Sequence, residues 1–459
     1  MKVLESYFGY WWLPHNENEK LYGILKITKS NGYILETIGH FSNTGDIVSE
    51  DFPQIIGLAR HSNINRDFSF NLLHCSIMNY LPSKLHYYKI IVSFFLRGES
   101  KSLNSDTLFN SSYFHPINID QWVNTNSFKI KEENHKMNFV LDYNSPENIL
   151  LYQDSDLKVD IGFLRRYNQP NEVGFKIEQS AYINLKFSKP IELEIIRKKV
   201  DIIRNFLTLA IGCPIYIEDY FFSKKNEDPK IKRTQIEYRF FREEKYIDKR
   251  YKKMYKWNML FTLKDIQTLC PNALSNWFAK QDEIKFTISN LFSTIYNGYL
   301  YVENTFLDYV FALEVYHRNR YPDQKLQSKS YLEKREKIIE KITNPSDKQW
   351  LEARLNEHKK EPNLILRLKH LNDIYQENYK DIFTADSLFF KKVVETRHHL
   401  VHHGVKYPEL IIRDEFELYA CSQKLEVMIK AILLIEIGFD TKFINSRLKT
   451  TTGWMTIFS

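Results

Sequence analysis

SLFFKKVVETRHHLVHHG, the stretch from Ser387 to Gly404, decides the fold of the second half of the chain. Its apolar residues recur at helical spacing, which predicts a helix from about Ser387 to His403. Gly404 suits the left-handed position that often follows a helix, and Pro408 prevents the helix from continuing. Asp414 then provides an N-cap for a long helix. Two helices joined by a short loop are therefore expected here.

The rest of the second half has the same 3.6-residue period. Further helices are predicted at about residues 304–316, 334–342, 348–359 and 364–375, and the last helix at 414–437, closed by Gly438. Asn344-Pro345 ends one of these helices after a few turns. Helices of this length with short connections are typical of a bundle of antiparallel helices.

The first half instead has short apolar, β-branched and aromatic runs between polar loops, which is typical of strands. Strands are predicted at Leu21–Thr28, Tyr33–Ile38, Phe68–Ile77, Tyr87–Leu96, Ala181–Phe187 and Ile215–Phe222. Asn31-Gly32 provides the positive φ values of a tight hairpin between the first two strands. One helix is predicted within this half, opening at Pro190 and running to about Ala210. We expect a β-dominated, sandwich-like domain.

The length of 459 residues exceeds the size at which one hydrophobic core keeps growing, so several domains are expected. Apolar residues at 43% and charged residues at 26% exclude a disordered or fibrous chain. We assign the chain to an α+β multidomain class. It comprises a β-rich domain at 1–225, a basic, aromatic-rich connecting segment at 226–284, and an all-α helical bundle at 285–459.

The basic charge is concentrated in one segment. From Phe221 to Lys256 there are 13 Lys or Arg against 6 Asp or Glu, a net charge of +7, which equals the net charge of the whole chain. Eight Phe or Tyr are interleaved with these charges, among them Tyr246, Tyr251 and Tyr255. Because Lys and Arg bind phosphates and aromatic rings stack on bases, the composition suits a nucleic-acid contact. A solvated helix or hairpin face has the same composition, so both interpretations stay open.

The cysteines argue against two kinds of site. Cys75, Cys213, Cys270 and Cys421 lie far apart and form no C-x-x-C pair, which argues against a disulfide framework and a thiolate zinc site. A reducing, cytoplasmic compartment is expected. Met1–Pro14 contains one lysine and no apolar run long enough for a signal peptide, and no stretch of about 18 apolar residues occurs. No membrane contact is expected.

The end of the helix at 387–403 is unusually rich in histidine. Four of the chain's 14 histidines lie between His398 and His403. Burying several histidines without partners is costly, so a functional explanation is favoured. One explanation is a metal site, because His398 and His402 have the i, i+4 spacing of the zinc-protease helix, although His399 stands where that motif requires Glu. A second is a nucleophilic pair with Cys421, although a free Cys on an apolar helix usually packs.

Metal-free cleavage of a phosphodiester is the third explanation. It needs a base for the 2′-hydroxyl proton, an acid for the leaving 5′-oxygen, and positive charge at the phosphorane. Histidine can act as acid or base, and the planar donors of arginine match phosphate oxygens. His402 lies in the last helical turn, where the helix dipole favours the imidazolium form and an acid role. Arg397 and His402 lie about 140° apart on an ideal helix, so a phosphate would have to bridge them within a cleft.

The run Arg397-His398-His399-Leu400-Val401-His402 resembles the motif of the HEPN ribonucleases, and within them the ApeA-like branch of anti-phage proteins. That motif is an Arg, four residues and a His, often with a polar residue directly after the Arg. The resemblance implies catalytic roles for Arg397 and His402. It implies a supporting role for His398, which stands where Asn is commoner.

Family members also carry an acidic residue on an early bundle helix, and the run from Phe306 to Glu314 is similar to that helix. The resemblance therefore adds Glu314 to the candidate catalytic residues. By spacing, Glu314 shares a helix face with Leu307, Val310 and Phe311. An acid on an apolar face calls for a partner, although Glu314 could equally lie at the edge of that face.

The N-terminal part of the chain extends the resemblance. Phe8–Pro14 (FGYWWLP), Gly23-Ile24-Leu25 and the Asn31-Gly32 hairpin are similar to the N-terminal domain that accompanies ApeA-type HEPN modules. The resemblance implies an abortive-infection ribonuclease that needs no metal or other cofactor. In it the HEPN bundle cuts RNA and the N-terminal domain acts as a sensor of a phage-derived trigger or a restraint.

The resemblance also implies a homodimer, or a larger homo-oligomer of dimers, in which two such helix ends face one cleft. A two-fold interface brings the same helix end from each protomer to the axis, which supplies both an acid and a base. The alternative function is a non-catalytic HEPN-type RNA-binding or regulatory module of a defence or toxin–antitoxin system. Retention of both Arg397 and His402 favours catalysis.

Overall fold

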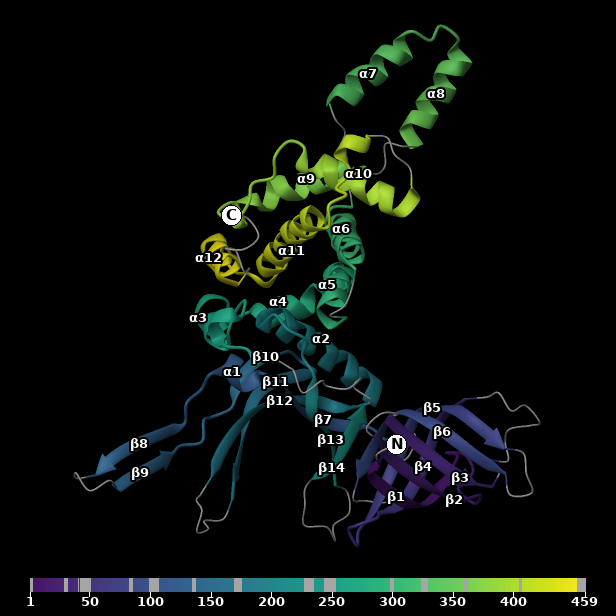
Figure 1. The fold of residues 1–459 in the computed structure, drawn as a ribbon, viewed down its shortest axis with the longest axis vertical. Coiled ribbons are helices and arrows are strands. Elements are labelled where there is room, and N and C mark those ends of the chain that lie inside the picture. The colour runs from purple at the N-terminus through teal and green to yellow at the C-terminus, as the bar shows by residue number, and fades with distance from the viewer. Residues whose placement is uncertain are drawn as a thin grey trace. The chain divides into compact units, whose positions relative to one another are not determined.

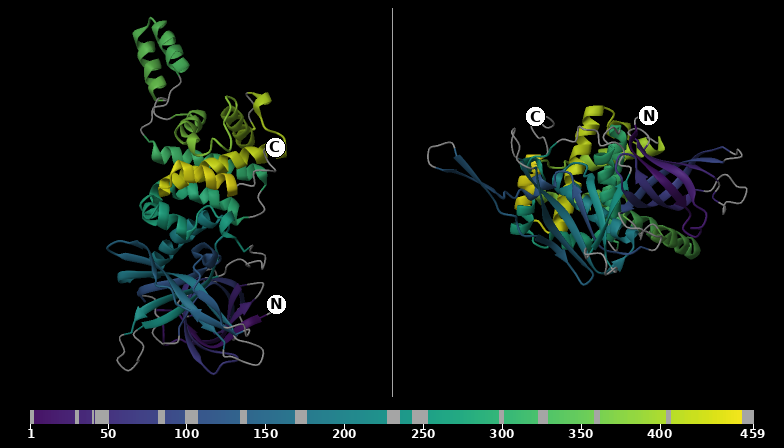
Figure 2. Two further views of the ribbon diagram at one scale, coloured as in Figure 1. Left: turned by 90° about the vertical axis from the view of Figure 1, so that its left-hand side faces the viewer. Right: turned by 90° about the horizontal axis from the view of Figure 1, so that it is seen from below.

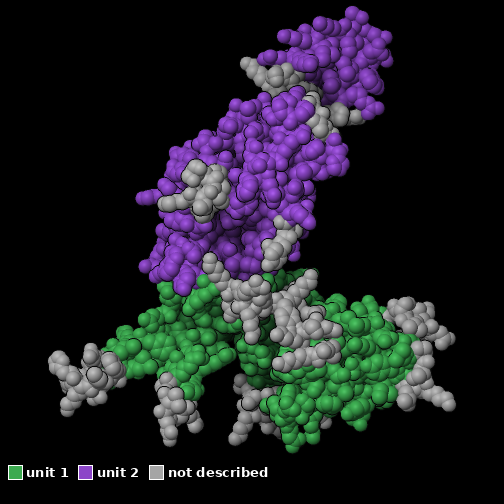
Figure 3. Space-filling view, viewed as in Figure 1, with its two compact units in different colours: residues 1–204, 215–253 green, residues 205–214, 254–459 purple. Residues whose placement is uncertain are grey.

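The computed structural model of the chain has strands in its first half and helices in its second (Figure 1). The structure describes residues 3–28, 32–39, 41, 51–81, 86–98, 107–133, 138–168, 176–226, 235–242, 253–297, 301–322, 329–357, 362–403 and 407–451. The chain forms two compact units, coloured in Figure 3. Unit 1 comprises Met1–Arg204 and Ile215–Lys253, and unit 2 comprises Asn205–Pro214 and Met254–Ser459.

Unit 1 is built mainly of antiparallel strands. They are β1 (Val3–Trp12), β2 (Leu21–Thr28), β3 (Gly32–Ile38), β4 (Phe52–His61), β5 (Asp67–Leu81), β6 (Tyr87–Gly98), β7 (Phe109–Pro116), β8 (Phe128–Glu133), β9 (Asn138–Tyr143), β10 (Ile149–Gln153), β11 (Leu157–Tyr167), β12 (Ile177–Ile191), β13 (Ile217–Lys225) and β14 (Gln235–Arg242). The short helix α1 (Ile119–Val123) and most of α2 (Leu193–Ile211) belong to the same unit.

Six of these strands close into a barrel. Their order is β6-β3-β2-β1-β4-β5, and β5 also pairs with β6, which completes the ring. The barrel is filled by large buried side chains such as Trp11, Phe70 and Phe95. Trp11 lies directly on Gly57, where an added Cβ would come within 2.2 Å of the indole ring. Glycine at position 57 therefore allows the ring to fill the centre of the barrel.

The sheet continues from the barrel through β14 to β13, β7, β12, β11 and β10, while β8 and β9 form a separate two-stranded ribbon. The prediction of a β-rich first half is confirmed. The sandwich-like arrangement is corrected, because the strands form one sheet whose end closes on itself. The hairpin glycine Gly32 has a φ of 66°, as the turn requires, and Asn31 lies outside the described residues.

Pro190 was predicted to open a helix, and this prediction is wrong. Pro190 lies inside β12, which ends at Ile191, and α2 begins at Leu193. The strand is prolonged because Ile191 pairs with Phe109 of β7, after an irregularity in the register that follows Lys186. A proline is tolerated where a strand ladder is interrupted. The long-range pairing with β7 therefore overrides the local helix-start signal.

Unit 2 is helical. Its elements are η1 (Lys256–Asn258), α3 (Leu263–Leu269), α4 (Ala273–Ala279), α5 (Gln281–Tyr296), α6 (Val302–Arg320), α7 (Lys329–Glu340), α8 (Pro345–Glu357), α9 (Leu364–Tyr375), η2 (Gln376–Asn378), α10 (Phe389–His402), η3 (Pro408–Leu410), α11 (Glu415–Ile437) and α12 (Thr441–Thr451). Figure 2 shows α7 and α8 side by side as a helical pair, and contacts between the two helices agree with this view. No helix within the described ranges is long and apolar enough to cross a membrane.

The predicted helical bundle is confirmed, and its best-predicted helices are α9 and α11. The bounds of α9 match the prediction. The Asp414 side chain accepts a hydrogen bond from the backbone N–H of Glu417 at 2.9 Å, and Gly438 takes the left-handed conformation after Ile437. The interior of the bundle is formed by α5, α6 and α11, which contact one another closely. The three-part division at residues 225 and 284 stays a prediction.

Candidate active site

The candidate catalytic motif lies on α10. This helix buries Phe390, Val393 and Thr396, which recur every three residues along one face. That face is covered by α6, α9 and η3. Arg397 is half-buried, while His398 and His402 are exposed. The packing of one face therefore leaves the two histidines on the surface of unit 2.

The last turn of α10 has a defined end. The backbone N–H of His403 donates to the carbonyl of His399 at 2.9 Å, and His403 itself adopts a left-handed φ of 53°. A histidine in this conformation is uncommon, but less so than a bulky or β-branched residue. The helix thus ends at His402, one residue earlier than predicted. The predicted stop, Gly404, lies outside the described residues.

The start of α11 is attached to α10 beside the motif. The backbone N–H of Ile412 donates to the Thr396 hydroxyl oxygen at 2.9 Å, and both residues are buried. Lys392 on α10 pairs with Glu417 on α11 at 2.9 Å. A buried hydrogen bond of this kind fixes the connection more firmly than the exposed ion pair does. The elements that surround the motif are therefore held together next to it.

Two pairs of imidazole rings meet at this helix end. The rings of His398 and His402 have centroids 5.1 Å apart, and those of His399 and His403 have centroids 6.4 Å apart. The first pair is exposed, so its nitrogens are accessible to a substrate. The Nδ1 atom of His399 is buried and has no hydrogen-bond partner in the described part of the chain. Two titratable side chains thus lie within reach of one phosphate.

Arg397 is the only arginine of the motif. Among the described residues its guanidinium forms no ion pair with a carboxylate, so its donors are not already used. A guanidinium can offer two parallel hydrogen bonds to one phosphate group. The structure therefore presents an arginine and two neighbouring histidines on the final turns of one helix, as the sequence spacing indicated.

Glu314 is not joined to this group by a hydrogen bond or ion pair. Its carboxylate pairs with Arg318, one turn further along α6, at 3.0 Å. The predicted apolar stripe is also corrected, because Phe311 is 51% exposed. The buried face of α6 runs instead through Phe306, Tyr309, Val310, Leu313, Tyr316 and His317. Glu314 therefore lies at the edge of that face and has a local partner.

The other two explanations of the histidine cluster gain no support. No group of three or more His, Cys, Asp or Glu side chains suited to a metal ion is found in the part of the chain that the structure describes. Cys421 is buried within α11, and burial raises the pKa of its thiol to about 12. A thiol with that pKa is protonated at neutral pH and is a poor nucleophile.

The family of the chain follows from two matches to family models. The model described as "ApeA N-terminal domain 1" matches residues 6–277, and the model described as "Apea-like HEPN" matches residues 307–443. The chain belongs to the ApeA family. Arg397, His398, His402 and Glu314 all lie within the HEPN match. No curated protein and no solved structure matches the chain.

The comparisons confirm the resemblance to ApeA-like HEPN anti-phage proteins, and with it the general character of a HEPN nuclease-type protein. The two matched regions follow the same order as the β-rich and helical halves of this ApeA-family protein. The matches do not test the roles of single residues, so the catalytic assignments stay predictions.

A buried polar network of this ApeA-family protein was missed in the sequence. Glu436 on α11 is buried and accepts a hydrogen bond from the Tyr316 hydroxyl of α6 at 2.5 Å. Its other oxygen accepts from Lys280, and Arg320 lies 3.4 Å away. Burial alone would raise the pKa of Glu436, but the hydrogen bonds and positive charges around it hold the pKa below the usual value. The only sequence signal was an acid in the apolar run from Ala431 to Ile437.

A second network of the same bundle joins α6 to α9. Arg367 Nη1 lies 3.1 Å from His317 Nδ1, and His317 Nε2 lies 3.1 Å from His370 Nδ1. Since a guanidinium can only donate, His317 accepts at Nδ1 and donates its Nε2 proton to His370. Burial, followed by the charge of Arg367, lowers the pKa of His317 to about 4, so its ring is neutral. This network connects α6 and α9, which both cover the buried face of α10.

Proposed function

We propose that this ApeA-family protein is a metal-independent endoribonuclease of anti-phage defence, with Arg397 and His402 as its catalytic pair. The observation that carries the proposal is the exposed end of α10, where His398 and His402 adjoin each other and Arg397 has no carboxylate partner among the described residues. These groups supply proton transfer and positive charge, which are what phosphodiester cleavage by an internal nucleophile requires.

The proposed reaction forms one bond and breaks one. The ribose 2′-oxygen attacks the adjacent phosphorus as a base removes its proton. Arg397 stabilises the negative charge of the phosphorane, and the His402 imidazolium gives its proton to the departing 5′-oxygen. The products are a 2′,3′-cyclic phosphate and a 5′-hydroxyl. His398 orients the phosphate beside His402.

Cleavage is expected to persist in EDTA and to leave 2′,3′-cyclic phosphate ends, because internal attack by the 2′-hydroxyl needs no metal-bound water. The measurement is gel analysis of a labelled RNA, followed by chemical identification of the new 3′ ends. A metal-dependent ribonuclease in the same buffer serves as the control, since EDTA must stop it. Loss of activity in EDTA that zinc or manganese restores would contradict the proposal.

We further propose that the working unit is a dimer, with the α10 ends of two protomers at one cleft. One helix places Arg397 about 140° from His402, so a two-fold partner can offer its own acid or base to the same phosphate. Large apolar side chains are exposed on α10 and in the first turns of α11, including Val401, Tyr419 and Phe416, the last of which is 83% exposed. An interface there would cover them.

Mixing wild-type protein with the Arg397→Ala/His402→Ala double variant tests the shared site. Under subunit exchange, activity is expected to fall more steeply than simple dilution, because mixed dimers lack part of the machinery. Exchange is checked by recovering differently tagged copies together. Activity strictly proportional to the wild-type fraction, with exchange verified, would mean that one protomer suffices and that His398, His399 or His403 supplies the second group.

We also propose that the N-terminal domain controls when the nuclease is active. An active ribonuclease in the cytoplasm harms its own host, and the motif that carries chemistry lies in the helical half of the chain. A phage-derived trigger acting through the β-rich half would restrict cleavage to infected cells. Defence by abortive infection follows from cleavage under such control.

A further inference from the structure

Tyr255 and Trp257 form a stacked aromatic pair on the surface of unit 2. Their ring planes differ by 1° and the ring centroids are 4.8 Å apart. Tyr255 is 49% exposed and Trp257 is 59% exposed. They stand at the start of η1. Tyr255 lies in the described part of the basic, aromatic-rich run that ends at Lys256, and Trp257 directly follows that run. Tyr246 and Tyr251 of that run lie outside the described residues.

Basic residues lie on the two elements that carry and contact this pair. Lys256 stands between the two rings in the sequence and is exposed, and α12 packs against η1. That helix carries the exposed Lys449 and the half-buried Arg447. Basic residues therefore occur both within η1 and on the helix that packs against it.

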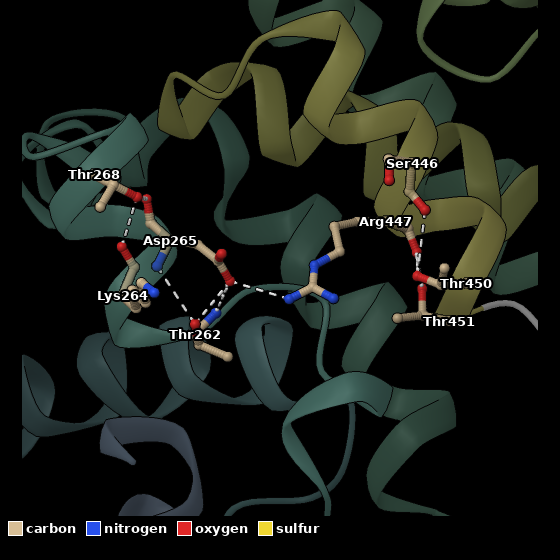
Figure 4. A network of polar contacts seen from close by, with 8 residues as sticks. All are labelled: Thr262, Lys264, Asp265, Thr268, Ser446, Arg447, Thr450 and Thr451. Carbon is tan, nitrogen blue, oxygen red and sulfur yellow. Dashed lines mark hydrogen bonds and ion pairs between the residues drawn. The ribbon is translucent and has the colours of Figure 1, made fainter. Parts of the chain in front are cut away.

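A polar network connects α12 to α3, the helix that follows η1. Arg447 Nη2 lies 3.2 Å from Asp265 Oδ2, as Figure 4 shows. The same carboxylate accepts from the backbone N–H and hydroxyl of Thr262 at 2.7 and 2.8 Å, in the capping box of α3. The Oδ2 atom of Asp265 is thus bound by both Thr262 and Arg447. The contact links α12 to α3, which follows η1. It also pairs the negative charge of Asp265 with the positive charge of Arg447.

A parallel pair of exposed rings with lysines beside it matches the way proteins bind single-stranded nucleic acid. Bases stack on aromatic side chains while basic residues follow the phosphates. A duplex keeps its bases stacked inside and cannot use such rings. An apolar protein surface could cover the rings but would leave the positive charges without a complement.

We propose that Tyr255 and Trp257 form a base-stacking site for single-stranded RNA, with Lys256 and Lys449 as its phosphate contacts. This inference rests on the proposed ribonuclease activity and names the form of RNA that the enzyme holds. An unpaired base lies on the free face of the Trp257 indole. The site recognises a strand without reading its sequence, because every base has a face that can stack.

The test uses the full chain with His402→Ala, so that the RNA is not consumed. Fluorescence anisotropy of a labelled oligouridine of about 12 nucleotides, a length within the usual site sizes, gives the dissociation constant. Trp257→Ala is expected to weaken binding by about 5- to 100-fold, and Trp257→Phe by much less. Trp350→Ala is the matched control, because Trp350 on α8 is 61% exposed and is expected to leave binding unchanged.

The lysines give an independent readout. The Lys256→Ala/Lys449→Ala double variant is expected to show a weaker dependence of RNA affinity on salt concentration. With fewer phosphate contacts, RNA binding releases fewer counterions. An RNA duplex is expected to compete poorly. Unchanged oligouridine binding by Trp257→Ala, or equal competition by duplex, would overturn the stacking site.

The result is separable from the proposed catalysis. If His402→Ala stops cleavage but Trp257→Ala leaves both oligouridine binding and KM unchanged, the ribonuclease stands and the stacking site is wrong. If Trp257→Ala weakens binding while His402→Ala still cleaves RNA, the stacking site stands and the catalytic assignment is wrong.

Discussion

Replacing His402 by alanine is expected to lower the rate of RNA cleavage by about 10²- to 10⁴-fold, the usual contribution of a general acid or base, and to remove toxicity in cells. Arg397→Ala is expected to cost about 10²- to 10³-fold, because the developing charge on the phosphorane loses its donors. Cleavage rates of purified variants and growth after induced expression are the two measurements.

Both replacements should leave the fold intact. His402 is exposed, and Arg397 is half-buried and has no ion pair among the described residues. Neither replacement is therefore expected to create a cavity or to leave a buried charge without its partner. Circular dichroism and the melting temperature check this expectation. His398→Ala is the matched control on the same helix face, and its loss of activity should be smaller because it orients the phosphate and transfers no proton.

Two outcomes would change the interpretation. Full toxicity from a soluble, folded His402→Ala protein would remove His402 from the catalytic machinery. If wild-type protein binds RNA but does not cleave it, the chain is a non-catalytic HEPN module that binds or regulates. The half-buried Arg397 and the exposed His402 can serve both functions, and only the rate measurement separates them.

The fold was predictable where local signals agree with the packing. Strands β2 and β3 have alternating apolar residues around a turn glycine, and α9 and α11 have clear caps and periods. Barrel closure was not predictable, because β6 pairs with β3, far earlier in the chain, as well as with its sequence neighbour β5, and no local residue pattern specifies the distant pairing. Pro190 was misassigned for the same reason, since a distant strand prolongs β12.

The site was predictable in part, because its main residues lie within one helical turn and a half of sequence. Arg397, His398 and His402 needed only the period of α10 to be placed. The position of Glu314 depended on which face of α6 is buried, and Phe311 proved to be exposed. The networks of Glu436 and His317 join side chains that are 50 or more residues apart, as the Arg367 and Tyr316 contacts show. The spacing of residues along a single helix does not predict contacts between side chains so far apart in the sequence.

Replacing Glu436 by alanine is expected to lower the free energy of unfolding of the helical bundle by about 3 kcal/mol, the lower end of the range for a broken buried charge pair. The lower end applies because Lys280 and Arg320 are partly exposed and can turn to water once their partner is lost. The buried Tyr316 hydroxyl keeps only its bond to Tyr375 at 2.8 Å. Loss of the helical circular-dichroism signal in urea measures the change.

The pH dependence identifies the carboxylate as the cause. Because the pKa of Glu436 is lowered in the folded bundle, its stabilising effect is complete above the ordinary glutamate value of 4.5 and is lost as the pH falls through the lowered value. The stability difference between wild type and Glu436→Gln should therefore shrink on acidification. Glu377→Ala is the control, since its pair with Lys380 is exposed and screened by water and is expected to contribute little. A difference that stays constant down to pH values below the folded pKa would show that packing around residue 436, and not its charge, stabilises the junction of α6, α9 and α11.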